Sequence, residues 1–396
     1  MQSAMTPLGV EEVALEYASG LALAEPIPAP RSLPSFSNSA LDGYAVRAED
    51  VSQAPVDLEV IEEIAAGSIP TTKLGPGQAM RIMTGAPLPA GADAVIGIED
   101  TSVVAGRSRI GKAVPAGNAV RPAGEDIQAG AVVFEAGTRL TPVRVGVLAA
   151  LGISAPRVFR RPRVAVLSTG AELATGGKAQ PGQILDSNRP MLLAALRELD
   201  VVPIDLGLVG DDASQLASRL QQAAASTDVI ITSGGVSVGD HDLTRKVVAE
   251  LGSIELWQVA MQPGRPFAFG RVGAVPFFGL PGNPVSALVG FEQLVRPGLL
   301  AMLGSRFRFR PRVGGRLTHA VTGNPEKTVF VRVTTELREP TWWATPIEGQ
   351  GSHMLVQASR ADAFAVLPPG TGAIAAGNEV SLEMSGWPEA RVGLDV

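Results

Sequence analysis

Residues 228–251 read DVIITSGGVSVGDHDLTRKVVAEL, and this stretch decides the fold. Its first part, DVIIT, is apolar and predicts a buried strand, whereas LTRKVVAEL has the spacing of an amphipathic helix. Between the two lies a loop rich in glycine and serine that ends in Asp240, His241 and Asp242. A strand that runs through such a loop into a helix is the repeating unit of an α/β domain.

The same alternation extends on both sides, from about residue 160 to residue 304. The expected strands are 163–168, 201–209, 228–233, 267–270 and 275–280. The expected helices are 187–199, 212–224, 242–251 and 284–303. We therefore predict a doubly wound α/β/α domain over 160–304, with helices on both faces of the sheet.

The rest of the chain has a different character. Residues 7–19 predict a first helix because Val10, Val13, Ala14 and Tyr17 share a helical face. Residues 47–126 alternate short strand-like runs with Gly and Pro turns and predict a β-rich module. Residues 308–396 contain strand-like pieces and predict a small β-barrel or sandwich. The fold class is thus α/β with added β modules.

Composition narrows the function. The chain has 396 residues and no cysteine, which excludes disulfides, thiolate metal sites and a cysteine nucleophile. With three histidines, any metal is expected to be a hard cation held by carboxylates and phosphates. A net charge of −6, 5% aromatic residues and no basic blocks give no reason to expect nucleic acid. Without a long apolar run or a signal-peptide pattern, we expect a cytoplasmic protein and no membrane partner.

Three loops leave strand ends in the α/β domain, at 168–177, 233–242 and 280–287. Ligands of open α/β sheets bind at the carboxyl ends of the strands, and Gly-rich turns let backbone amides approach an anion. A single such loop is more often only a tight turn, but three at one rim predict an anionic ligand. The candidate anion-binding residues on these loops are Ser168, Thr169, Gly170, Ser233, Gly234, Gly235, Ser237, Gly239, Gly282 and Asn283.

Acidic and basic residues accompany these loops. Asp186 and Asp242 are candidate Mg²⁺ ligands, because Mg²⁺ takes one or two carboxylates together with phosphate oxygens. The alternative for Asp240 is a helix cap, and Asp242 also suits the first turn of a helix. Arg265 lies in the proline-braced sequence PGRP and is a candidate for binding an oxyanion, a solvent-exposed arginine being the alternative.

Eight motifs occur in an order that resembles the molybdopterin molybdotransferases, relatives of the E domain of gephyrin. They are SNSALDGYAV, RIMTGAPLP, AGEDI, STGAEL, DSNRPML, TSGGVSVGDHD, PGRPFAFG and GLPGNPVSA, and they span nearly the whole chain. The resemblance implies an elongated homodimer with four domains per subunit, in which 1–46 and 127–159 form a linker and dimerisation domain. It also implies that 160–304 resembles molybdopterin adenylyltransferase.

The reaction implied by the resemblance is insertion of molybdate into adenylated molybdopterin, with Mg²⁺-dependent cleavage of the phosphoanhydride and release of AMP. Molybdate is a substrate, and the adenylyltransferase of the same pathway is a candidate partner. Two alternatives stay open at this point: the preceding adenylation step, and a non-catalytic scaffold like gephyrin. A preference for tungstate over molybdate is a third alternative.

The family's functional residues carry over by motif. Those implied to be catalytic are Asp42, Thr84, Asp126, Glu172 and Asp242; those implied to shape the third loop or bind molybdate are Pro281, Pro284, Ser286, Arg332 and Ser352. A capping or turn role is the alternative for the first three, and a solvent-facing strand position is the alternative for Arg332. The chain departs from the family pattern at Gln262 and Arg265, where lysines are common, and at Ser37, where aspartate is common.

Overall fold

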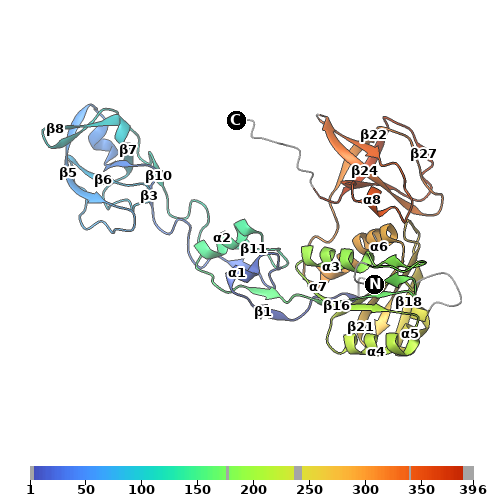
Figure 1. Ribbon diagram of the computed structural model, residues 1–396. Helices are drawn as coiled ribbons and strands as arrows, with labels where there is room; N and C mark the ends of the chain where they lie inside the picture. Colours follow the sequence, from blue (N-terminus) through green and yellow to red (C-terminus); the bar gives the residue numbers. More distant parts are fainter. Residues whose placement is uncertain (1–3, 175–177, 236–242, 339, 387–396) are drawn as a thin grey trace. The chain divides into compact units, whose positions relative to one another are not determined.

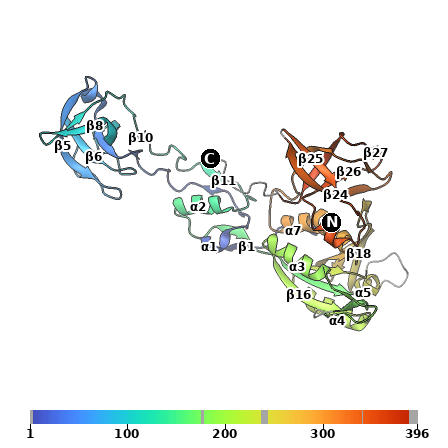
Figure 2. The same cartoon turned by 45° about the horizontal axis from the view of Figure 1, so that its top comes forward.

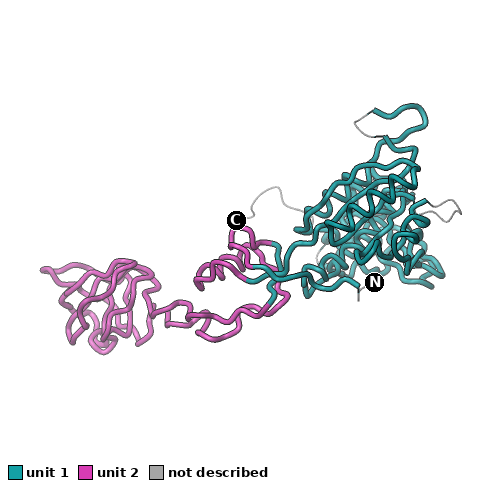
Figure 3. Tube along the Cα trace, turned by 90° about the horizontal axis from the view of Figure 1, so that it is seen from below, with its two compact units in different colours: residues 1–11, 20–24, 157–396 teal, residues 12–19, 25–156 magenta. Residues whose placement is uncertain are grey.

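The computed structural model describes residues 4–174, 178–235, 243–338 and 340–386. The chain forms two compact units, which Figure 3 distinguishes by colour. Unit 1 comprises Met1–Glu11, Gly20–Ala24 and Arg157–Val396, and unit 2 comprises Glu12–Ser19 and Glu25–Pro156. Unit 1 contains the α/β domain and the C-terminal barrel, and unit 2 contains the β-rich module.

The α/β domain is built on a six-stranded mixed sheet in the order β16-β13-β17-β21-β20-β18. The first four strands of that order are parallel, and β20 is antiparallel to both its neighbours. The bounds are β13 Arg163–Thr169, β16 Val202–Val209, β17 Val229–Ser233, β18 Gly252–Gln258, β20 Pro266–Val272 and β21 Val275–Leu280. The five expected strands are confirmed, and β18 is an edge strand that the sequence pattern did not reveal.

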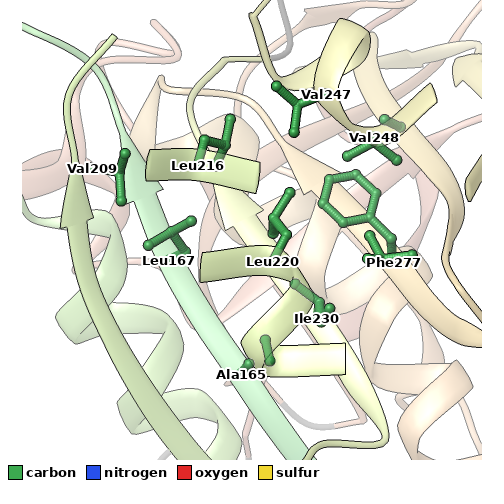
Figure 4. Packing of buried hydrophobic residues seen from close by; sticks show 12 residues of the cluster. Ala165, Leu167, Val209, Leu216, Leu220, Ile230, Val247, Val248 and Phe277 are labelled. Atoms are coloured by element: carbon green, nitrogen blue, oxygen red, sulfur yellow. The ribbon is translucent and has the colours of Figure 1, made fainter. Parts of the chain in front are cut away.

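Helices cover both faces of this sheet, as expected (Figure 1). On one face lie α4 (Ala213–Ala224) and α5 (Leu243–Leu251); on the other lie α3 (Asn188–Glu198), α6 (Pro284–Gly290) and α7 (Arg296–Met302). Figure 4 shows Leu216 and Leu220 of α4 and Val247 and Val248 of α5 packed over Ile230 and its neighbours in the sheet. Burial of such apolar side chains is the main force that holds helices and sheet together.

Local sequence explains where these helices begin. Asp212 caps α4, since its carboxylate accepts hydrogen bonds from the amides of Ser214 and Gln215 at 2.9 and 3.0 Å. Pro284 begins α6 at a position where the missing N–H costs nothing. The expected long helix over 284–303 is confirmed, with one π-helical turn at Phe291–Val295 between α6 and α7.

The C-terminal domain is a closed five-stranded barrel. Its sheet runs β24-β25-β22-β28-β26, and pairing of β26 with β24 closes it. The bounds are β22 Arg312–Leu317, β24 Thr328–Arg338, β25 Thr341–Pro346, β26 Ala363–Leu367 and β28 Glu379–Met384, with a small β23 (Val321–Thr322) and β27 (Ala373–Ile374) hairpin and the short α8 (Leu355–Ala358). The barrel expectation is therefore confirmed.

Two features join the barrel to the α/β domain. Residues Met261–Gln262 form β19, which pairs in parallel with β24 of the barrel, while β20 begins four residues later in the α/β sheet. An apolar seam also runs between the domains, made of Val285 and Val289 of α6 and, from the barrel, Phe330 and Phe364. These two rings meet edge to face at 6.2 Å. The two domains of unit 1 are thus packed against each other.

Unit 2 contains a six-stranded sheet in the order β7-β4-β6-β5-β9-β8, which agrees with the expectation of a β-rich module. The bounds are β4 Gly43–Val46, β5 Val56–Ile64, β6 Gln78–Ile82, β7 Ala94–Gly97, β8 Thr101–Val104 and β9 Arg107–Ile110. Smaller elements are the pairs β2 (Ile27–Pro28) with β11 (Val132–Phe134) and β3 (Asn38–Ser39) with β10 (Val120–Arg121), and helix α2 (Pro142–Ala150). Figure 2 shows this sheet and α2 in blue and blue-green.

The helix expected over 7–19 is wrong. The structure has a strand, β1 (Val10–Glu12), and only one helical turn, α1 (Leu15–Ala18). The amides of Val13 and Leu15 donate to the carbonyls of Pro156 and Ser154, so extended pairing takes the place of helical bonds. Tyr17, on the supposed apolar face, is 63% exposed. Periodicity alone did not reveal this competing backbone partner.

Candidate functional site

The three rim loops meet at the carboxyl ends of β13, β17 and β21. Gly234 and Gly235 continue from β17 with φ of +89° and +66°, a conformation that side chains rarely adopt. A Cβ at Gly234 would overlap the carbonyl oxygen of Thr169, and one at Gly235 would overlap the hydroxyl of Thr244. The second loop is therefore pressed against the first, and glycine is required at both positions.

Asn188 ties the rim together. This residue begins α3, is 7% exposed, and donates from its side-chain nitrogen to the Ser233 hydroxyl and to the Gly282 carbonyl, both at 2.8 Å. One amide group thus connects the helix after the first loop to the second and third loops. The sequence analysis quoted Asn188 within DSNRPML but gave it no role.

A cavity of about 630 Å³ opens between these loops; we call it the rim cavity. Its lining includes most of the residues expected on the loops, namely Ser168, Thr169, Ser233, Gly234, Gly235, Pro281, Gly282, Asn283 and Pro284. Glu172 and Asp186 also line it, and so does His353 from the barrel domain. Gly170 adjoins it, since a Cβ there would meet the Glu172 carboxylate at 2.6 Å.

The two carboxylates reach the rim cavity through a short parallel strand pair. Strands β14 (Leu173–Ala174) and β15 (Ile184–Leu185) pair directly, and the amide of Ile184 donates to the Glu172 carbonyl at 2.8 Å. Asp186 accepts from the amide and the guanidinium of Arg189 at 3.2 and 3.0 Å. The Asp186 carboxylate is therefore engaged in an ion pair, and the Glu172 carboxylate is the more exposed of the two.

Several buried oxygens at this rim have no hydrogen-bond partner among the described residues. They are the hydroxyls of Ser168, Thr169, Thr232 and Thr244 and the side-chain oxygen of Asn188. Buried polar atoms are normally satisfied, and unsatisfied ones call for an explanation such as a bound ligand, water or ion. Their concentration at the ends of β13 and β17 agrees with a site for a polar ligand.

A second cavity, of about 670 Å³, lies where the barrel packs on the α/β domain; we call it the seam cavity. Arg265, Ser286 and Ser352, three expected anion-binding residues, all line it, together with Gln262 and Lys327. None of the described residues that line this cavity is acidic. The seam cavity is therefore electropositive, which suits a small anion.

Arg332 of β24 adjoins the seam cavity. Its side chain is 1% exposed and donates to the carbonyls of Gly349 and Gly351 at 2.8 and 3.3 Å. Its Nε atom has no partner, and no carboxylate in the described part of the chain pairs with it. Burial lowers the pKa of Arg332 below its ordinary value. A buried cation without a counter-charge is costly, so an anion bound in this cavity would relieve the penalty.

The two cavities share a wall. Asn283 and Pro266 line both, and the side-chain nitrogen of Asn283 donates to the Ser352 hydroxyl at 3.0 Å. The amide of Val285 donates to the Ser352 carbonyl, also at 3.0 Å. These two bonds, the Ser352 clip, fix the barrel loop against the third rim loop. Ligands of the two cavities would therefore be neighbours.

Three of the residues implied to be catalytic belong to unit 2, whereas every residue that lines the two cavities belongs to unit 1. Within unit 2, Asp42 accepts from the amide and the hydroxyl of Thr84, both at 2.7 Å. These bonds, the amide first, lower the pKa of Asp42. Asp126 is exposed, and its amide donates to the Leu33 carbonyl.

Ser237, Gly239 and Asp242, together with Asp240, lie outside the described residues, so their assignments stay predictions. In the described part of the chain, no group of three or more acidic or histidine residues is placed to hold a metal ion. Lys327 and His353 were not predicted as site residues, because only the packing of the barrel brings each of them to a cavity.

Among the described residues, none of the helices has the length and the apolar character needed to cross a membrane. Three regions of the chain match family descriptions in consecutive order. Residues 1–152 match "MoeA N-terminal region (domain I and II)", residues 165–301 match "Probable molybdopterin binding domain", and residues 315–384 match "MoeA C-terminal region (domain IV)". Both cavities are lined from the second and third of these regions.

Individual relatives agree over nearly their whole length. Molybdopterin molybdenumtransferase 2 of Mycobacterium tuberculosis is 40% identical over 381 residues, which cover 93% of this chain and 94% of the relative. Molybdopterin molybdenumtransferase of Haemophilus influenzae is 39% identical over 384 residues, which cover 95% of this chain and 94% of the relative. A solved structure of the molybdopterin biosynthesis moeA protein of Pyrococcus horikoshii superposes with a TM-score of 0.84 at 29% identity, and covers 97% of both chains. On this agreement, the chain belongs to the molybdopterin molybdenumtransferase family.

Proposed function

We propose that this chain is a transferase that inserts molybdenum, supplied as molybdate, into adenylated molybdopterin and releases AMP. Membership of the family supports the transfer of molybdenum to molybdopterin as the reaction. Two adjoining cavities of different chemistry support the use of two substrates, an adenylated molybdopterin and molybdate. One cavity offers glycine loops and hydroxyls, as a diphosphate needs, and the other offers cations without acids, as an oxyanion needs. The single observation that carries the proposal is that Asn283 lines both cavities.

The rim cavity is the proposed site of the diphosphate in adenylated molybdopterin. The left-handed turn at Gly234 and Gly235 brings the backbone close to the cavity, and the unpartnered hydroxyls of Ser168 and Thr169 add donors. Backbone amides and hydroxyls arranged around a concavity are the usual way to bind phosphate without many cations. The residues of the rim would hold and orient the phosphoanhydride for cleavage.

The seam cavity is the proposed site of molybdate. Arg265 and Lys327 line it, and the buried guanidinium of Arg332 adjoins it. Gln262 and Arg265 stand where the family resemblance implies two lysines, so one positive charge fewer is expected at this position. Lys327, which carries no ion pair with a described residue, supplies a charge from the barrel side of the same cavity. Ser286 and Ser352 add hydroxyl donors to the oxyanion.

The rim cavity also suits Mg²⁺. Glu172 and Asp186 line it together with unpartnered hydroxyls, and this all-oxygen donor set is the kind that Mg²⁺ prefers. When bound, Mg²⁺ would offset negative charge on the diphosphate. Asp242 stays the sequence-based candidate for a further ligand. We further propose a homodimer in the cytoplasm, as the family resemblance implies, and place Asp42, Thr84 and Asp126 among the residues that serve the reaction.

The test is molybdate-dependent AMP release from adenylated molybdopterin, measured for the wild type, for Lys327→Gln and for the control Lys112→Gln. Lys112 lies in unit 2 and pairs with Asp100. We expect the KM for molybdate to rise about tenfold in Lys327→Gln, because one charged contact to molybdate is lost. The KM should stay unchanged in the control Lys112→Gln. A wild type that releases no AMP with molybdate, yet adenylates molybdopterin with Mg-ATP, would establish the alternative adenylyltransferase activity instead.

A further inference from the structure

His353 is the only basic side chain among the described residues that line the rim cavity. The other ionisable groups in that lining are the carboxylates of Glu172 and Asp186, and the rest are apolar, hydroxyl or amide residues. A diphosphate carries two negative charges, and two carboxylates add to the repulsion. The Mg²⁺ proposed for this cavity would offset part of that negative charge, and His353 is the basic side chain of the lining that could contact the diphosphate as well.

The position of His353 is set by the barrel, not by the α/β domain. His353 follows Ser352, whose hydroxyl and carbonyl both accept hydrogen bonds from the third rim loop, at 3.0 Å each. The imidazole lies over Gly351, where a Cβ would meet its Cε1 atom at 2.9 Å. The Ser352 clip and the small residue beneath the ring thus hold His353 at the mouth of a cavity made by another domain.

Arg189, which follows the lining residue Asn188, is already paired with two acids. Arg189 is bonded to Asp186 at 3.0 Å and also pairs with Asp205. Its guanidinium therefore neutralises acids and is not directed to a ligand of the rim cavity.

We propose that His353 binds the diphosphate of the adenylated substrate in the rim cavity, so that the barrel domain supplies a residue to a site built mainly by the α/β domain. This inference rests on the proposed function, because it assumes that a diphosphate occupies the rim cavity. An imidazole ring offers N–H donors to phosphate oxygens, and a guanidinium at the same position would offer donors to the same oxygens.

The experiment measures binding of ADP-ribose to the full-length protein by calorimetry with Mg²⁺ present. ADP-ribose is the probe because it contains a diphosphate that is esterified at both ends, as in the adenylated substrate. The variants are His353→Gln, which removes the imidazole ring, and His353→Arg, which places a guanidinium there. His319→Gln is the matched control, because His319 lies in the same barrel and its Nδ1 atom pairs with the Thr318 hydroxyl at 2.9 Å.

We expect His319→Gln to bind ADP-ribose as tightly as the wild type does, and His353→Gln to bind it about tenfold more weakly, because one contact to the diphosphate is lost. His353→Arg, which keeps donors for the phosphate oxygens, should bind at least as tightly as the wild type. A His353→Gln variant that keeps the wild-type affinity would overturn the role of His353 and leave the rim cavity as a diphosphate site. No binding of ADP-ribose by the wild type would overturn the diphosphate site itself.

Discussion

Replacement of Asn188 by alanine should loosen the rim on which both cavities depend. The substitution removes two buried hydrogen bonds of 2.8 Å, one to the Ser233 hydroxyl and one to the Gly282 carbonyl. Each such bond contributes about 1 kcal/mol net, so local opening of the rim should become easier by about 2 kcal/mol. A free-energy change of about 1.4 kcal/mol changes an equilibrium constant tenfold, so the equilibrium constant for opening of the rim should rise about 30-fold.

Hydrogen exchange followed by mass spectrometry measures this opening directly. The informative peptides cover 229–235 and 279–287, because the Gly234 amide is bonded to the Leu280 carbonyl at 3.0 Å. Asn118→Ala is the matched control, since Asn118 donates one part-buried bond to the Val95 carbonyl in unit 2. We expect faster exchange at the rim in Asn188→Ala only, accompanied by slower AMP release.

The reasoning would be refuted by rim exchange that changes less than about threefold in Asn188→Ala. Such a result would mean that the three loops hold their positions without the shared amide, and that the glycine contacts alone define the rim cavity. Faster exchange of the rim peptides in Asn118→Ala would also contradict it, because the effect would then be global and not local.

Three further predictions follow from single contacts. Gly234→Ala should abolish AMP release, because the new Cβ would overlap the adjacent rim loop. The control Gly182→Ala should retain activity, because Gly182 has a similar φ of +88° but open space around it. Steady-state assays of AMP release compare the two variants. Thr84→Val should raise the pKa of Asp42 toward its ordinary value, because the bond from the Thr84 hydroxyl is lost; carbon-detected NMR titration measures this pKa. In the wild type, this bond stabilises folded unit 2 at any pH above the ordinary pKa of aspartate. The stabilisation is lost as the pH falls through the lower pKa that Asp42 has in the folded state. Arg332→Met should raise the KM for molybdate at least about tenfold, and an unchanged KM would contradict the role of Arg332 in molybdate binding. The resistance of the protein to unfolding by urea should stay equal or increase, because the substitution removes a buried cation that has no acidic partner.

The α/β domain was predictable from sequence because its elements are long and periodic. Leu216 and Leu220 recur at helical spacing, and the runs before each rim loop are apolar, so strands, helices and the rim followed from local pattern. The edge strand β18 and the region 7–19 were not predictable in this way. In both, backbone pairing decides the conformation: β18 pairs with the nearby β20, whereas residues 13–15 bond to residues 154–156. The periodicity within one segment carries no information about such partners.

The site was predictable where function resides in a contiguous loop and not where it depends on packing. Ser233, Gly234 and Asn283 stand in glycine-rich turns whose composition indicates an anion site. Lys327 and His353 were given no role from the sequence, and they reach the cavities they line only because the barrel packs on the α/β domain. Their roles become visible from the arrangement in space alone.

The loop that carries Arg265 begins in one sheet and ends in another. Strand β19 belongs to the sheet of the barrel, and β20, which starts at Pro266, belongs to the sheet of the α/β domain. Arg265 is therefore anchored to both sheets, and its position in the seam cavity is set by the way the barrel and the α/β domain pack together.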